Sequence, residues 1–75
     1  MTMAEAYKRL LDWAAKTDHT PDVTSTGTGS YSITVAIEDP VTYRAFAAAE
    51  TIEETAVQVI QQLETVSGRA LEEIP

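Results

Sequence analysis

The sequence predicts an α+β fold in which a helix, three strands and a second helix follow one another along the chain. Two stretches, one near each end, repeat their apolar residues every three or four positions, which is the period of an amphipathic helix. The middle of the chain instead alternates apolar and polar residues, which is typical of a half-buried strand. We therefore expect a three-stranded antiparallel sheet with the two helices on one of its faces.

The size and composition of the chain bound what it can be. It has 75 residues, of which 44% are hydrophobic, too many for a disordered chain. We expect a single domain over residues 1–75, with an ordered core at about 3–67 and a C-terminal tail at 68–75. The chain has no cysteine, which excludes disulfide and thiolate chemistry. It shows no apolar run of membrane-spanning length and no secretory signal, so we expect a cytoplasmic protein.

The first expected element is a helix over roughly residues 2–17. Thr2 is followed three positions later by Glu5, which makes a capping box at the start of this helix. One arc of the helix is apolar and consists of Met3, Ala6, Tyr7, Leu10, Leu11, Trp13 and Ala14. Trp13 lies at the edge of the arc, where it either seals the small core or anchors a partner, and we favour the first role.

A β-hairpin over residues 23–38 is expected after a polar loop. The loop, residues 18–22, contains a proline and the only histidine, His19, which we expect to be solvated. Gly27 and Gly29 supply the turn of the hairpin. After the turn, one face of the chain carries Tyr31, Ile33, Val35 and Ile37. This strict alternation predicts a half-buried antiparallel strand.

Residues 41–49 fit two different structures. As a strand they follow a turn at 38–40 and alternate between two faces. As a helix they begin at a proline, are rich in alanine and continue into one helix over 40–66, which gives an α-β-β-α order. However, Thr51 and Glu54 form a second capping box, and a helix start signal would be wasted in mid-helix. We therefore favour a third strand.

From Thr51 onward a helix is expected under either alternative. Its apolar stripe consists of Ile52, Ala56, Val59, Ile60, Leu63 and Val66. Ser67 and Gly68 are a typical helix stop. Glu53 and Glu54 occupy the first turn, where the helix dipole favours negative charge.

Most of the net charge lies in the last third of the chain. Five Lys and Arg against twelve Asp and Glu give a net charge of −7. Residues 50–75 hold six carboxylates and one arginine, so they account for −5 of it. A field of this sign repels phosphate backbones and attracts basic surfaces. An acidic chain with only two lysines also fits adaptation to a high-salt cytoplasm, which is a second explanation of the charge.

The order of elements and the local sequence resemble the double-stranded-RNA-binding domain over about residues 4–66. AYKRLLDWAAK is similar to the first helix of that family, and YSITV is similar to its central strand. Thr51 stands where the family has a serine that caps its last helix. The family continues with Lys-Lys-x-Ala-Lys, which grips phosphates, and here the three lysine positions are Ile52, Glu53 and Ala56. The resemblance implies the fold, and the lost lysines imply that duplex RNA is not the ligand.

A weaker likeness is to HicB-type antitoxins, in which a short sheet leads through Thr-x-Glu-Glu into a helix. Residues 43–45, followed by 51–54, are similar to that pattern. This likeness implies an antitoxin-like component, which we keep as an alternative together with a double-stranded nucleic-acid-binding protein.

The function we expect is that of a non-enzymatic protein-binding module, a small acidic regulator or inhibitor of the phage or mobile-element type. It would engage a basic surface of a partner protein, such as a nucleic-acid-binding surface, as a phosphate mimic does. The candidate contact residues are Glu50, Glu53, Glu54, Glu64, Trp13, Tyr43 and Phe46. A homodimer that buries Phe46 or the edge at Trp13 is a further expectation.

Catalysis is not expected from this sequence. A single histidine and no cysteine leave too few ligands for a zinc site. Glu53 and Glu54 are neighbours on a helix and point about 100° apart, so they do not converge as an acid–base pair. We predict no catalytic, cofactor-binding or metal-binding residues.

Overall fold

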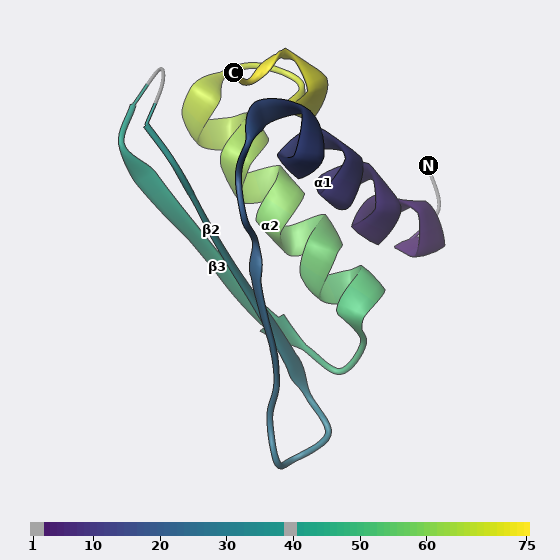
Figure 1. The fold of residues 1–75 in the computed structure, drawn as a ribbon. Helices are drawn as coiled ribbons and strands as arrows, with labels where there is room; N and C mark the ends of the chain where they lie inside the picture. Colours follow the sequence, from purple (N-terminus) through teal and green to yellow (C-terminus); the bar gives the residue numbers. More distant parts are fainter. Residues whose placement is uncertain (1–2, 39–40) are drawn as a thin grey trace.

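The structure, a computed structural model, describes residues 3–38 and 41–75. Its elements are α1 (Met3–Thr17), β1 (Asp22–Ser25), β2 (Tyr31–Ile37), β3 (Tyr43–Ala49), α2 (Ile52–Ser67) and the 3₁₀-helix η1 (Leu71–Glu73). The strands form one antiparallel sheet in the order β1-β2-β3, and both helices lie on the same side of it (Figure 1). The predicted α+β class and element order are confirmed. Thr2 and the turn residues 39–40 lie outside the described residues.

Residues 43–49 form strand β3, so the alternative of one long helix over 40–66 is wrong. Every residue of β3 pairs with β2, from Tyr43 opposite Ile37 to Ala49 opposite Tyr31. The side chains alternate as the sequence predicts: Ala45 is buried and Phe46 is exposed. α2 packs directly against β2 and β3, where small alanine side chains leave room for it.

Both ends of α2 coincide with the predicted signals. The Thr51 side chain accepts a hydrogen bond of 3.1 Å from the backbone N–H of Glu54. At the other end Gly68 has a φ of 69°, and its N–H donates to the Glu64 carbonyl at 2.9 Å. The buried side chains of α2 are those of Thr55, Ala56, Val59, Ile60 and Leu63. Local chemistry therefore sets both boundaries of this helix.

The core lies between the inner face of the sheet and the two helices. α1 packs along α2 and not directly on the strands of the sheet. The largest fully buried side chains are those of Leu10, Ile33, Ile37, Ile60, Leu63, Leu71, Ile74, Val35, Val59 and Thr55. β1 contributes little to this core, since all of its residues are exposed. The turn that joins β1 to β2 reaches past the ends of the two helices (Figure 1).

Residues 68–75, which the sequence assigns to a tail outside the core, pack against the helices. Leu71 is fully buried and Ile74 is 1% exposed, and both belong to the core cluster. The ordered core thus continues past residue 67. These two apolar side chains stand among glutamates, so their spacing alone does not mark them as a core segment.

α1 ends at a left-handed residue that is not glycine. Asp18 has a φ of 60°, and the N–H of His19 donates to the Ala14 carbonyl at 2.9 Å. This is the Schellman arrangement, in which the left-handed position favours glycine or asparagine. Asp18 also places a carboxylate at the C-terminal end of the helix, where the dipole disfavours negative charge.

We expect Asp18→Asn to raise the free energy of unfolding by about 0.3–1 kcal/mol, because asparagine accepts the left-handed backbone and removes the unfavourable charge. Urea titration followed by circular dichroism measures the change. Asp22→Asn is the matched control, because Asp22 is exposed and lies away from the helix terminus. Equal stabilisation by both variants would assign the effect to net charge and contradict the dipole argument.

Candidate functional site

The residues predicted to contact a partner do not gather on one surface. Glu50, Glu53 and Glu54 lie at the start of α2, while Glu64 lies near its other end. Because a helix rises about 1.5 Å per residue, roughly 15 Å separate Glu54 from Glu64 along α2. The three aromatic candidates, Trp13, Tyr43 and Phe46, lie on α1 and β3.

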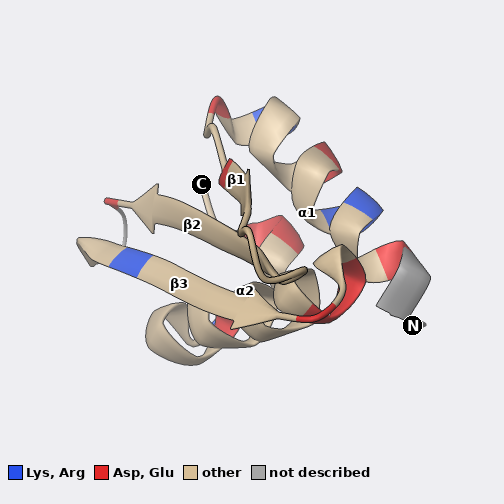
Figure 2. Ribbon diagram, turned by 90° about the horizontal axis from the view of Figure 1, so that it is seen from below, with Lys and Arg blue, Asp and Glu red and all other residues tan. Residues whose placement is uncertain are grey.

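The first turn of α2 and the turn before it form an acidic patch, defined by Glu50, Glu53 and Glu54. Glu50 and Glu54 are exposed, and Glu53 is half-buried. Within the described part of the chain, no side chain pairs with any of these three carboxylates. The first turn of α1, which contains Glu5, lies at the same end of the molecule as the start of α2 (Figure 2). The acidic patch itself therefore carries negative charge that forms no ion pair among the described residues.

Several positive side chains lie away from the acidic patch. Arg44 lies at the start of β3, whereas Glu50 follows the end of that strand. Lys16 lies in the last turn of α1, and that end of the helix lies away from the start of α2 (Figure 1). A patch of one sign attracts an approaching basic surface.

Glu64 does not join the acidic patch, because it is committed to Arg9. The Arg9 Nη2 atom lies 2.9 Å from Glu64 Oε2, which also accepts a 2.9 Å hydrogen bond from the backbone N–H of Leu71. This single carboxylate therefore ties α1, α2 and the segment of η1 together.

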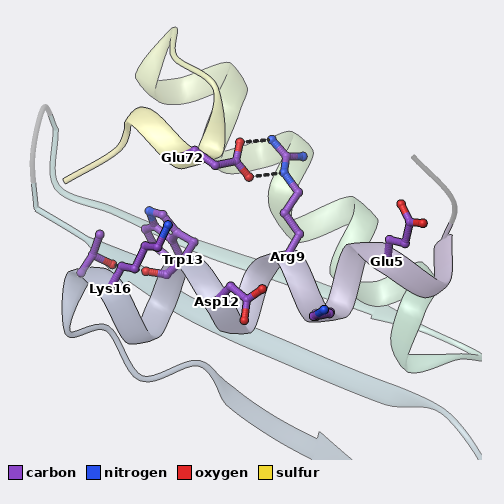
Figure 3. A pocket seen from close by; sticks show the side chains of 8 residues that line it. Glu5, Arg9, Asp12, Trp13, Lys16 and Glu72 are labelled. Atoms are coloured by element: carbon purple, nitrogen blue, oxygen red, sulfur yellow. Dashed lines mark hydrogen bonds and ion pairs between the residues drawn. The ribbon is translucent and has the colours of Figure 1, made fainter.

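Arg9 also binds Glu72 through two parallel hydrogen bonds. Its Nη2 donates to Glu72 Oε1 at 2.7 Å, and its Nε donates to the other carboxylate oxygen (Figure 3). These bonds hold the pKa of Glu72 below its ordinary value and raise the pKa of Arg9 further. Arg9 is thus a structural clamp, which the sequence pattern does not reveal.

Trp13 is 3% exposed, so its ring has no surface to offer a partner. Its Nε1 donates to the Ile74 carbonyl at 2.9 Å. The ring stacks on His19 with a centroid separation of 4.5 Å and an interplanar angle of 17°. His19 is half-buried and bonded to the Thr17 hydroxyl, so it is not the freely solvated loop residue that the sequence predicts.

A groove of about 500 Å³ runs beside α1 above Trp13 (Figure 3). Three basic side chains and three acidic ones line it, so it has no net charge with which to select an ion. Those side chains are Lys8, Arg9, Lys16, Glu5, Asp12 and Glu72. Among residues 3–38 and 41–75 no group of three or more His, Asp or Glu side chains is placed to hold a metal ion.

The two aromatic candidates on β3 lie on opposite faces of the sheet. Phe46 is 56% exposed on the outer face. Tyr43 shares the inner face with Ala45 and is half-buried, and its hydroxyl donates to Gln62 Oε1 at 3.4 Å. Of the aromatic candidates, only Phe46 presents most of its ring to solvent.

The α-β-β-β-α order with a three-stranded antiparallel sheet is compatible with a fold like that of the double-stranded-RNA-binding domain. In the part of the chain that the structure describes, no helix combines the length and the apolar character needed to cross a membrane. In comparisons with known proteins, no family model, no curated protein and no solved structure matches this chain.

Proposed function

We propose that this protein is a non-enzymatic protein-binding module of the cytoplasm, with the double-stranded-RNA-binding-domain type of fold, whose acidic patch docks onto a basic surface of a partner protein. One observation carries the proposal. Glu50, Glu53 and Glu54 are solvent-accessible and have no partner among the described side chains. They lie around the helix start that is lysine-rich in the RNA-binding family, and Glu53 stands at one of the lysine positions.

The proposed partner surface is one that ordinarily binds phosphates. Carboxylates on a rigid helix start can accept hydrogen bonds from Arg and Lys side chains, as phosphate oxygens do. The cap at Thr51 fixes the backbone of the first turn, so the positions from which Glu53 and Glu54 extend are set before binding. A small acidic domain of this kind acts as a regulator or inhibitor by occupying the basic surface.

An amide-shift titration in low salt tests the proposal with two probes, an oligoarginine peptide and a short RNA duplex. We expect the peptide to shift the amides of residues 50–55 and the duplex to shift none. Glu53→Gln with Glu54→Gln should weaken peptide binding about tenfold, because two charged contacts are lost.

The matched control is Asp22→Asn with Glu38→Gln, which removes the same charge from two exposed sites outside the acidic patch. If both double variants weaken the peptide equally, the charge is a general property of the surface and the proposal fails. If the duplex instead shifts α1 and the turn at 27–30, the protein is a nucleic-acid-binding module.

A further inference from the structure

A side chain from α2 closes the outer edge of β3. The Gln62 carboxamide accepts a hydrogen bond from the Phe46 N–H at 3.1 Å and donates one to the Phe46 carbonyl at 2.6 Å. These are the two bonds that one residue of a neighbouring strand, through its own N–H and C=O, would make with Phe46 in an antiparallel ladder. Gln62 thus stands in for a fourth strand at one point of the edge.

The rest of this edge has few of the features that usually prevent strand addition. β3 is last in the sheet order, and its sequence YRAFAAA contains no proline and one charge. Backbone groups alternate in direction along a strand, so those of Arg44 and Ala48 point outward as those of Phe46 do. By contrast β1, at the other edge, is only four residues long.

We propose that the outer edge of β3 is a latent pairing surface for a second copy of this chain, and that Gln62 holds it closed. A second copy fits because the edge is self-complementary. With Phe46 opposite Phe46, antiparallel pairing sets Arg44 of each copy opposite Ala48 of the other, which avoids like charges. The two Phe46 rings, each 56% exposed, then meet on the outer face. This edge is separate from the acidic patch, so the inference does not depend on the proposed function.

Sedimentation velocity over a concentration series tests the inference on wild type, Gln62→Ala and Gln61→Ala. Gln61 is the matched control because it is the exposed neighbour of Gln62 on the same helix. We expect wild type and Gln61→Ala to stay monomeric and Gln62→Ala to dimerise at least about tenfold more tightly than wild type. Dimerisation that Gln62→Ala leaves unchanged, or that wild type already shows to the same extent, would overturn the inference.

Gln62→Met keeps the length of the side chain without its hydrogen bonds, and it serves if Gln62→Ala does not fold. Gln62→Met should produce the same dimer as Gln62→Ala. Hydrogen exchange then locates the change: the Phe46 amide should lose protection in the dilute monomer and regain it in the dimer. If the Phe46 amide exchanges at the same rate in wild type and the variant, Gln62 does not protect the outer edge of β3.

The register gives a second test in the Gln62→Ala background. Ala48→Glu places a carboxylate opposite Arg44 of the other copy at two symmetric positions, whereas Ala48→Lys places a like charge there. Because cross-strand pairs contribute about 0.2–1 kcal/mol each, we expect the dimer to be about fivefold tighter with Glu and about fivefold weaker with Lys. Equal effects of the two substitutions would rule out pairing centred on Phe46.

Discussion

Leu71→Ala should unfold a large fraction of the protein at 25 °C. Leu71 is fully buried, and the loss of such a side chain costs about 2–5 kcal/mol. A core of this size supplies only about 3–5 kcal/mol in total. The substitution therefore removes most of the stability, although it lies in a three-residue 3₁₀-helix near the end of the chain. Urea unfolding followed by circular dichroism measures the loss.

Glu73→Ala is the control for this prediction, because Glu73 is exposed in the same 3₁₀-helix. It should change the free energy of unfolding by less than about 0.5 kcal/mol. Trp13 fluorescence adds a local probe, since the Trp13 Nε1 donates to the Ile74 carbonyl. If Leu71→Ala unfolds at the same urea concentration as Glu73→Ala, residues 70–75 do not belong to the cooperative core.

The parts of the fold that follow from local chemistry could be predicted from the sequence. The alternation from Tyr31 to Ile37 specifies a strand with one buried face, and the structure has that strand. The Thr51 cap decided between strand and helix for the preceding residues, because a side chain that caps a helix marks its first turn. Such signals act over a few residues and need no knowledge of the tertiary fold.

The packing of the C-terminal segment could not be predicted in the same way. Leu71 and Ile74 are buried only because α1 and α2 together form a surface that receives them. The clamp that holds this segment joins residues far apart in the chain: 63 positions separate Arg9 from Glu72, and 55 separate it from Glu64. The sequence pattern within one helix cannot indicate pairs between residues so far apart in the chain.

In the candidate site too, local sequence predicts some positions and tertiary packing decides the others. Glu53 and Glu54 lie at the helix start where the sequence places them, since their position follows from the cap. In the sequence Glu64 looks like another exposed acid. In the structure its carboxylate accepts a hydrogen bond from the backbone N–H of Leu71. Gln62 gives no signal at all, because its partner is the backbone of Phe46, 16 positions earlier in the chain.

The clamp at Arg9 should make stability depend on pH in the acid range. Arg9 holds the pKa of Glu72 below its unfolded value, so Glu72 binds a proton more readily in the unfolded chain than in the folded one. Its contribution is therefore complete above the unfolded pKa of about 4.3 and is lost as the pH falls through the folded pKa. The Glu72 side chain is 54% exposed, so solvent screening keeps this contribution small.

Arg9→Met should lower the free energy of unfolding by about 1–2 kcal/mol at neutral pH, since it removes two partly exposed ion pairs. The difference from wild type should shrink as the pH falls through the lowered pKa that Glu72 has in the folded wild type, because the ion pair is lost when Glu72 is protonated. Lys8→Met is the control, because it removes the same charge from the neighbouring exposed position. Its difference from wild type should not shrink in step with the protonation of Glu72. If the difference between each variant and wild type stays constant down to acid pH, the ion pair of Arg9 with Glu72 does not contribute to stability, and η1 is held by the burial of Leu71 and Ile74 and by their hydrogen bonds to Glu64 and Trp13.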